Sequence, residues 1–379
     1  MIPFNRPALI GNELELITES VRNGHISGNG PFTIKAEKLL TEITCAHHTL
    51  LTTNCTHALE LAARVLRLGP GDEVIVPAFT FVSTAAAIAL TGARPVFIDV
   101  LPGTLNLDPA LVEQAITPNT KAVFTVHYAG IGDQVQQLAA LCNRNGIALI
   151  EDNAHGLGGT FQNKALGSFG AMSTLSFHET KNITCGEGGA LTLNSPDLLE
   201  AAEILREKGT NRARFLRGQV DKYTWVDVGS SWVASDILAA YLVAQLENFG
   251  SIQKKRHRIW NSYSSELTGW AVDQGVRLPQ VPAEAGHSAH MFYLHLQDVE
   301  SRSRFIDHMK EKGVMAVFHY QALNTSEVGK RLGGIPGQCP VSESAAQTLV
   351  RLPLFVDLKE AELDQIISAV KGFETNQRG

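Results

Sequence analysis

Lys181 is the residue of this chain whose surroundings best suit covalent chemistry. It lies in a polar stretch, 176–189, between two short β-rich runs at 171–175 and 190–193. The hydroxyl of Ser176 precedes the lysine by five residues, and a glycine-rich bend begins five residues after it. A polar turn between two buried strands holds reactive groups rigidly, and a neutral lysine amine is a nucleophile. The alternative is a surface loop with a solvated lysine, the usual situation of this residue type.

Acidic and imidazole side chains follow a second strand-like segment, 147–151. Asp152 comes directly after it, and His155 follows three residues later. A buried acid at this point could keep a heterocycle nitrogen protonated, as pyridoxal phosphate enzymes require, or it could only cap a helix. His155 could contact the same ligand or be a structural histidine.

Other strand ends carry groups suited to a phosphate and to a planar ring. Thr56 lies between a strand and a helix and can cap that helix, whose N-terminal dipole attracts phosphate. Ser176 could supply a second phosphate ligand, and Phe81 could stack on a planar cofactor. The alternatives are a plain helix cap for Thr56 and core packing for Phe81. Together with Lys181, Asp152 and His155, these residues form the set that a pyridoxal phosphate enzyme needs.

Strands and helices alternate through the first two thirds of the chain. Helices are expected at 11–22, 32–43, 57–67, 83–91, 108–116, 133–145 and 196–208, and strands at 50–53, 73–76, 95–99, 121–126, 147–151, 171–175 and 190–193. Short apolar strands in this alternation indicate an α/β protein with a mostly parallel sheet covered on both faces, which places ligands at the carboxyl ends of its strands.

The pattern changes in the last third of the chain. A helix from about Ser235 is expected to continue, or to kink, through 247–266. Shorter elements follow it: strands at 290–297 and 314–318, and helices at 300–312, 342–349 and 359–371. We therefore predict a large domain at 1–248 and a smaller C-terminal α+β domain at 249–379.

Composition excludes several classes of protein. The 379 residues carry a net charge of −6, which gives no basic surface for nucleic acid. The apolar runs are too short to span a membrane, and the N-terminus lacks the pattern of a signal peptide. Five scattered cysteines argue against disulfides and a zinc ribbon, so we expect a soluble cytoplasmic protein without a metal. The cluster Cys45, His47 and His48 is expected to be a turn into a strand.

Two nucleotide-binding classes are also disfavoured. A Walker motif with its Lys-Ser/Thr ending is absent from the sequence, and the glycines at 156–159 and 186–189 do not match the dinucleotide fingerprint. A nicotinamide-dependent dehydrogenase on a doubly wound sheet is therefore the weaker alternative.

The ordered set of motifs resembles the DegT/DnrJ/EryC1/StrS sugar aminotransferases over residues 1 to about 372. Within this family, the chain is most similar to the subgroup that forms dTDP-4-amino-4,6-dideoxygalactose for enterobacterial common antigen, a lipopolysaccharide-related pathway. The matching stretches are long and polar, at 176–182, 206–212, 215–225 and 315–320. The resemblance implies the type I fold of aspartate aminotransferase.

The resemblance also implies a cofactor and roles for individual residues. Lys181 would bond covalently to pyridoxal 5′-phosphate and act as general base, while Asp152 would hold the ring nitrogen protonated. The remaining cofactor contacts would come from Thr56, His57, Phe81, His155, Ser176 and, from a neighbouring subunit, Ser231. Contacts to the nucleotide sugar would include Lys208, Arg212, His319 and Tyr320. L-glutamate would aminate C4 of dTDP-4-dehydro-6-deoxy-D-glucose, and sharing of active sites would require a homodimer.

Two positions depart from the family pattern. Ser231 stands where the family has an asparagine that binds phosphate across the subunit interface, and Asn324 stands where it has a histidine near the substrate. Lys181 is retained, whereas dehydratases of the family have a histidine there. The alternatives are an aminotransferase of different regiochemistry or C4 configuration, and a non-catalytic regulator on the same fold.

Overall fold

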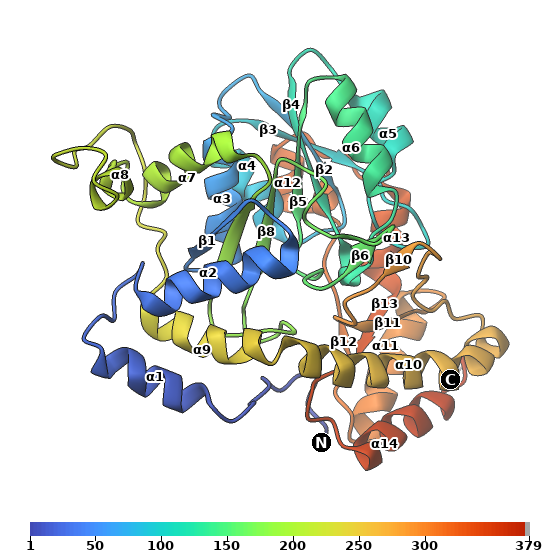
Figure 1. Cartoon of the computed structure of the whole chain (residues 1–379). Coiled ribbons are helices and arrows are strands. Elements are labelled where there is room, and N and C mark those ends of the chain that lie inside the picture. The colour runs from blue at the N-terminus through green and yellow to red at the C-terminus, as the bar shows by residue number, and fades with distance from the viewer. Residues whose placement is uncertain (376–379) are drawn as a thin grey trace.

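A seven-stranded sheet is the centre of the protein, and it positions the candidate residues (Figure 1). The computed structural model describes residues 1–375. The strands follow the order β1-β9-β8-β5-β4-β2-β3. Their bounds are β1 His48–Thr52, β2 Glu73–Pro77, β3 Arg94–Ile98, β4 Thr120–Val126, β5 Ala148–Asp152, β8 Met172–Ser176 and β9 Gly189–Leu193. Strands β8, β5, β4, β2 and β3 are parallel, and β9 is antiparallel to both of its neighbours, so the expected mostly parallel sheet is confirmed.

Helices cover both faces of this sheet because its strands are apolar on both sides. Val74 and Val76 of β2 belong to the core under one set of helices, whereas Ile75 between them belongs to the core on the opposite face. The first face is covered by α3 Cys55–Val65, α4 Val82–Ala89 and α7 Leu199–Arg206. The second is covered by α2 Pro31–Thr44, α5 Pro109–Ala115, α6 Val135–Arg144 and α9 Asp236–Glu247, with α1 Glu13–Arg22 packed on α9.

A long helix connects this unit to a second core. Helix α9 ends at Glu247 and α10 runs from Phe249 to Gln274, so the expected continuous or kinked helix is two helices separated at Asn248. Ile252 of α10 still packs in the core beside α9, whereas Ile259 belongs to the C-terminal core. The division at 248/249 stays a prediction.

The C-terminal core surrounds a three-stranded antiparallel sheet with the order β11-β13-β12. Its elements are β11 Phe292–His295, α11 Val299–Glu311, β12 Val317–Phe318, α13 Pro340–Thr348, β13 Leu349–Leu352 and α14 Glu360–Lys371. The helix expected at 342–349 ends at Thr348, and the chain continues as β13, which the sequence pattern did not predict. Pairing of β13 with two partner strands outweighs the local helical pattern.

Several short elements were also not predicted. They are a small sheet of β6 Thr160–Phe161, β7 Lys164–Ala165 and β10 Ala285–Gly286, the helices α8 Arg212–Leu216 and α12 Glu327–Arg331, and the 3-10 turns Tyr128–Gly130, Pro196–Leu198 and Leu323–Thr325. The turn expected at Cys45 is confirmed, since Cys45 ends α2 in a left-handed conformation just before β1.

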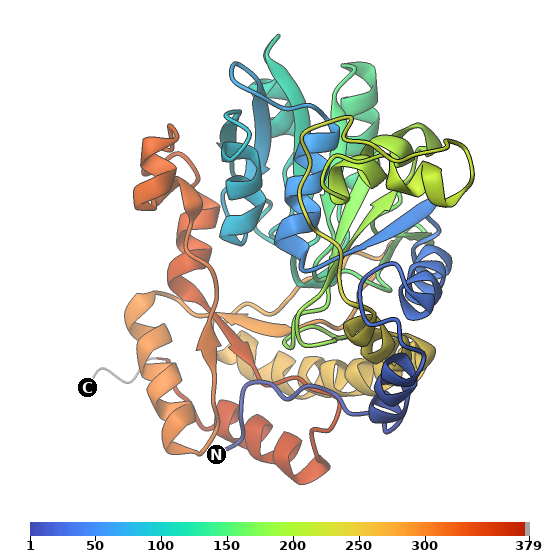
Figure 2. The ribbon, with the colours of Figure 1, turned by 90° about the vertical axis from the view of Figure 1, so that its left-hand side faces the viewer.

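The N-terminal segment packs against the C-terminal core. The backbone N–H of Ile2 donates to the carbonyl of Gly313 at 2.7 Å, and Ile2 pairs with Val314. Figure 2 shows this segment running beside the C-terminal helix before it reaches α1. Among residues 1–375, none of the helices is both long and apolar enough to cross a membrane.

Candidate active site

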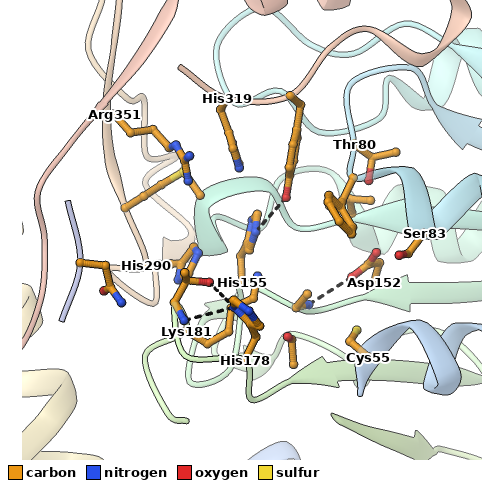
Figure 3. A pocket seen from close by; sticks show the side chains of 18 of the residues that line it. Cys55, Thr80, Ser83, Asp152, His155, His178, Lys181, His290, His319 and Arg351 are labelled. Atoms are coloured by element: carbon orange, nitrogen blue, oxygen red, sulfur yellow. Dashed lines mark hydrogen bonds between the residues drawn. The ribbon is translucent and has the colours of Figure 1, made fainter. Parts of the chain in front are cut away.

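A cavity of about 850 Å³ lies at the carboxyl ends of the parallel strands, where the large sheet faces β12 and β13 (Figure 3). Its volume is within the range of small-molecule sites. The sequence-predicted residues that line it are Thr56, Phe81, Asp152, His155, Ser176, Lys181, His319 and Tyr320. The fold therefore brings together most of a set that is dispersed over more than half of the chain.

The loop that carries Lys181 is fixed at both ends. Its flanks pair through the N–H of Phe177 and the carbonyl of Gly188 at 2.8 Å. Asn182, the next residue after the lysine, donates to the carbonyl of Ser288 at 2.8 Å. Gly189 is required at the end of the loop, because a Cβ atom there would lie 2.3 Å from the backbone of Asn54 at the start of α3.

Lys181 has the electrostatic surroundings of a reactive amine. Burial lowers the pKa of Lys181 to about 8, and the positive charge of Arg351 acts in the same direction. The Cys55 thiol and the Asp152 carboxylate oppose this change. A substantial fraction of the amine is therefore neutral, and so nucleophilic, near neutral pH.

Asp152 ends β5 and is buried on the far side of the cavity from Arg351 (Figure 3). Its Oδ2 accepts from the hydroxyl of Thr84 at 2.8 Å, and its Oδ1 accepts from the N–H of Ala154 at 3.2 Å. Burial raises the pKa of the Asp152 carboxyl, while these hydrogen bonds lower it. A carboxylate in such a low-dielectric position favours an adjacent cation, so it fits a protonated heterocycle nitrogen.

The preceding residue, Glu151, stiffens the end of the same strand. Its Oε2 lies 2.7 Å from Nε2 of His127 and accepts from the N–H of Gly167, while its Oε1 accepts from the N–H groups of Phe169 and Gly170 at 2.7 Å each. This buried network connects the ends of β4 and β5 and fixes the direction in which Asp152 leaves the strand.

Asp152 and the end of β5 form the first wall of the cavity, and the N-terminus of α3 forms a second polar wall. The expectation that Thr56 caps this helix is wrong, because Asn54 is the cap and its side chain accepts from the N–H of His57 at 2.8 Å. Thr56 lies in the first turn, and its hydroxyl lies 2.7 Å from that of Ser83. Thr56, Ser83 and Ser176 all line the cavity, so hydroxyls and a helix N-terminus together fit a phosphate.

His57, predicted to bind the cofactor, is directed away from this wall. Its Nδ1 forms a short hydrogen bond with the hydroxyl of Thr53, and its ring lies 6.1 Å from that of Trp232. The cavity lining includes Thr56 and excludes His57. His57 is thus placed to support the turn between β1 and α3.

Aromatic and imidazole rings form the third wall. His155 stacks on His290 with ring centroids 4.3 Å apart, and its Nε2 lies 3.3 Å from the hydroxyl of Tyr320. Phe81 lies 6.0 Å from the ring of Tyr320 and is 53% exposed. Burial lowers the pKa of His155 and of His290 well below the ordinary value, so both rings are neutral and can lie against a planar ligand.

His319 extends this wall toward β12. Its Nδ1 lies 2.7 Å from the hydroxyl of the fully buried Tyr128. Burial also lowers the pKa of His319 well below the ordinary value.

Four other residues singled out in the sequence lie elsewhere. Ser231 and Lys208 are exposed, and Arg212 of α8 pairs with Glu207 at 3.4 Å. None of these three lines the cavity described here, and α8 extends from the edge of the molecule (Figure 1). Asn324 is fully buried, and its amide donates to Glu343 and to the carbonyl of Ile335.

Several cavity residues were missed in the sequence. Tyr128, which does not line the cavity but supports His319 from behind, could also have been found, because it comes two residues after β4 and residues at strand ends are the natural candidates. Ser83 lies within the first turn after Phe81 and required only the same reasoning. Arg351 and His290 gave no local signal, because their strand pairing and loop packing bring them to the cavity from the C-terminal core.

The chain is similar to known proteins over nearly its whole length. A model of the DegT/DnrJ/EryC1/StrS aminotransferase family matches residues 7–371. The aminotransferase TlmJ from Streptoalloteichus hindustanus is 30% identical, with a TM-score of 0.89 and 98% of each chain covered. A Streptococcus pneumoniae protein, assigned as a sugar aminotransferase and solved in its PLP form, is 28% identical with a TM-score of 0.90, covering 98% of this chain and 97% of that one. 3-Amino-5-hydroxybenzoic acid synthase is 29% identical, with a TM-score of 0.87 and 97% of each chain covered.

Three features of the cavity fit pyridoxal 5′-phosphate, the cofactor in the Streptococcus pneumoniae structure: an amine for its aldehyde, an acid for its ring nitrogen and a hydroxyl-lined helix N-terminus for its phosphate. The chain belongs to the DegT/DnrJ/EryC1/StrS aminotransferase family, whose cofactor is pyridoxal 5′-phosphate and whose fold is the type I fold of such enzymes.

Proposed function

We propose that the protein transfers the amino group of L-glutamate to C4 of dTDP-4-dehydro-6-deoxy-D-glucose, giving dTDP-4-amino-4,6-dideoxy-D-galactose and 2-oxoglutarate. The observation that carries amino transfer is the presence of Lys181 and Asp152 in one cavity with the hydroxyl-lined start of α3. Support for the nucleotide sugar comes from the polar stretches at 206–225 and 315–320, which are similar to those of the matching subgroup.

The cofactor would be held by residues of all three walls. Thr56, Ser83 and Ser176 would donate to its phosphate, together with the N-terminus of α3. Asp152 would accept from the protonated ring nitrogen, and Phe81 would lie against the ring. Bound in this way, pyridoxal phosphate supplies a conjugated, electron-withdrawing ring that stabilises negative charge at the donor's Cα and accepts its amino group.

Lys181 would do the proton transfer. Because its amine is substantially neutral near pH 8, it can take the proton from the donor's Cα as a general base. The neighbouring rings of His155 and His290 are neutral and do not compete for that proton. In the second half-reaction the same lysine would return a proton to C4 of the sugar, and the face from which it does so would set the C4 configuration.

A homodimer would complete the site. The segment 206–231 lies outside this chain's own cavity but exposes large apolar side chains, with Trp225 72% and Val228 62% exposed. Such a surface is suited to burial against a second copy. Burial there would bring Lys208, Arg212 and Ser231 to the neighbouring cavity, where the first two would provide positive charge for a nucleotide diphosphate.

A second candidate is amino transfer to a different carbonyl, either at another sugar position or with the gluco configuration. The buried amide of Asn324, which replaces the family's substrate-region histidine, favours some change in acceptor recognition. One similar structure is named as a synthase of 3-amino-5-hydroxybenzoic acid, so proteins similar to this chain are named for different products.

The decisive experiment uses purified protein with pyridoxal phosphate, L-glutamate and dTDP-4-dehydro-6-deoxyglucose. We expect a yellow protein in which borohydride fixes the cofactor to the peptide containing Lys181, and an amino sugar whose NMR spectrum shows nitrogen at C4 with the galacto configuration. Lys181→Ala should abolish turnover, whereas Lys164→Ala, outside the cavity, should retain it. A colourless protein that takes up no cofactor would refute the enzyme assignment, and nitrogen at C3 would refute the regiochemistry alone.

A further inference from the structure

Tyr128 carries a buried hydroxyl with one recorded partner, the imidazole of His319. Tyr128 follows the end of β4 by two residues and is fully buried. The rings of Phe79 and Tyr293 pack against it, with ring centroids 5.2 and 5.7 Å away. Its hydroxyl lies 2.7 Å from Nδ1 of His319, and among residues 1–375 no other hydrogen bond of this hydroxyl is recorded. Packing therefore fixes the hydroxyl against one atom of His319.

The direction of this hydrogen bond follows from the surroundings of the two groups. If Nδ1 of His319 donated, the hydroxyl proton of Tyr128 would be buried without an acceptor, which is unfavourable. If the hydroxyl donates, Nδ1 accepts and both groups are satisfied. Burial raises the pKa of Tyr128 well above its ordinary value and lowers the pKa of His319 well below its own, so the phenol keeps its proton and the imidazole is neutral. The single proton of this neutral ring then lies on Nε2.

The Nε2 atom of His319 faces the cavity. His319 lines the cavity, and Figure 3 shows its ring directed inward, toward the side on which His155 lies. Among residues 1–375, Nε2 has no recorded hydrogen-bond partner and is not one of the buried unpartnered atoms, so a ligand can reach it. The ring is also held by Tyr320, which stacks on it with ring centroids 3.5 Å apart. His319 therefore offers an N–H donor of fixed direction.

His290 has the opposite arrangement in the same cavity. The side-chain amide of Asn182 donates to the carbonyl of Ser288 at 2.8 Å and to Oε1 of Gln253 at 3.1 Å. Its Oδ1 is therefore the acceptor for Nδ1 of His290, which lies 2.9 Å away. Burial lowers the pKa of His290 well below its ordinary value, so the ring is neutral, and its single proton lies on Nδ1. Two imidazoles of one cavity are thus given opposite hydrogen-bonding characters by different supporting residues.

We propose that Tyr128 is a positioning residue, which holds the proton of His319 on Nε2 and so directs an N–H donor at an oxygen of the bound ketosugar. This inference rests on the proposed amino transfer to a ketosugar, and it adds the direction of one hydrogen bond and the residue that sets it. A neutral donor suits the uncharged carbonyl and hydroxyl oxygens of a sugar. Glutamate instead offers carboxylates and an ammonium group, which charged partners bind more strongly than a neutral imidazole does.

The first test reads the tautomer directly in the cofactor-loaded enzyme. Nitrogen NMR of protein with isotope-labelled histidine distinguishes a bare ring nitrogen from one that carries a proton, and the signals of His319 are those lost in His319→Gln. We expect the proton on Nε2 in His319 and on Nδ1 in His290. In Tyr128→Phe the Nδ1 signal of His319 should shift, because it loses its hydrogen bond, while the signals of His290 stay in place. A proton on Nδ1 of His319 in the wild-type enzyme would overturn the proposal, and this measurement needs no variant of Tyr128.

The second test separates the two half-reactions, each followed by the absorbance of the cofactor. In Tyr128→Phe the concentration of dTDP-4-dehydro-6-deoxyglucose that gives half the maximal rate should rise roughly 5- to 10-fold, the effect of losing one well-directed hydrogen bond. The half-reaction with glutamate should stay within about twofold of wild type. An unchanged ketosugar half-reaction in folded Tyr128→Phe, or an equal loss with glutamate, would overturn the proposal.

Tyr293 provides a matched control. Its ring packs beside that of Tyr128 in the same core, and its hydroxyl is also buried, but among residues 1–375 that hydroxyl has no hydrogen-bond partner. Tyr293 does not line the cavity either. Tyr293→Phe should therefore leave both half-reactions unchanged. A loss equal to that of Tyr128→Phe would show that packing, and not the hydrogen bond to His319, is responsible.

A double substitution tests whether Tyr128 acts through His319. In a His319→Ala background, Tyr128→Phe should cause no further loss, because the hydroxyl has already lost the group that it orients. A further loss as large as that in the wild-type background would contradict the proposal. A thermal unfolding curve and the cofactor absorbance establish that each variant is folded and loaded. If the wild-type enzyme does not aminate this ketosugar, the proposed acceptor fails, whereas the tautomer of His319 is decided by the NMR measurement alone.

Discussion

The pH dependence of Lys181 reactivity in cofactor-free protein is a direct consequence of its position. An ordinary lysine has a pKa of 10.5, and burial lowers that of Lys181 to about 8. Because the neutral fraction falls about tenfold per pH unit below the pKa, roughly one Lys181 side chain in ten is neutral at pH 7, against about three in ten thousand for an ordinary lysine. At that pH the neutral fraction of Lys181 is therefore roughly 300 times that of an ordinary lysine.

The assay is competitive labelling with a pulse of acetic anhydride between pH 6 and 11. Mass spectrometry of the peptide containing Lys181 gives its acetylation rate, and a simple alkyl amine in the same tube is the reference. The rate should rise about tenfold per pH unit below pH 8 and level off above it. A rate that keeps rising to pH 10 would refute the conclusion that burial makes this amine reactive.

Two substitutions sharpen the same test because they act in opposite directions. The Asp152 carboxylate raises the pKa of Lys181, and the Arg351 guanidinium lowers it. Asp152→Asn should therefore shift the plateau to lower pH, and Arg351→Gln should shift it to higher pH. Shifts of the same sign in both variants would show that disturbed packing, not charge, controls the amine.

Three further outcomes follow from the contacts around the cavity. Glu151→Gln places an amide NH₂ against backbone donors and should lower the free energy of unfolding by about 3 kcal/mol, measured by urea denaturation; a loss under about 1 kcal/mol would contradict the network. Gly189→Ala drives a Cβ into the Asn54 backbone and should cost about 1–3 kcal/mol in the same assay, with weaker cofactor binding; unaltered binding would show that the α3 start tolerates displacement. Thr56→Val should weaken pyridoxal phosphate binding about tenfold but leave pyridoxal binding unchanged, in titrations followed by absorbance; equal losses for both ligands would exclude a phosphate contact.

Local sequence signals located the residues that lie at strand ends. Asp152, Ser176 and Lys181 were found because short apolar runs mark the buried strands and parallel strands present their carboxyl ends to a common edge. The helix boundary at Asn54 was less accessible, since two polar residues, Asn54 and Thr56, could each cap α3. Geometry at the end of β1 decides between them, and sequence spacing alone does not.

Residues brought in by distant pairing were not predicted. Arg351 lies just after the helix expected at 342–349, in a segment for which no strand was expected, and β13 pairs there with β11 and β12 on its two sides. His57 was assigned to the cofactor together with Thr56 through the family resemblance, but successive residues in a helix point in different directions, and the ring of His57 packs near Trp232. The roles of Lys208, Arg212 and Ser231 depend on a second copy of the chain and stay predictions.

The reversed strand β9 has a consequence for how this enzyme could diversify. Parallel strands must be joined by long crossovers, so the chain after Asp152 belongs to the crossover between β5 and β8. Strands β8 and β9 are antiparallel neighbours, and the segment between them leaves and re-enters the sheet at one edge as a hairpin. The reactive lysine is thus carried on a short hairpin connection, and Asn182 beside it binds the carbonyl of Ser288. Changes within this hairpin preserve the order of all seven strands, but they must also preserve that contact and the close approach of Gly189 to Asn54.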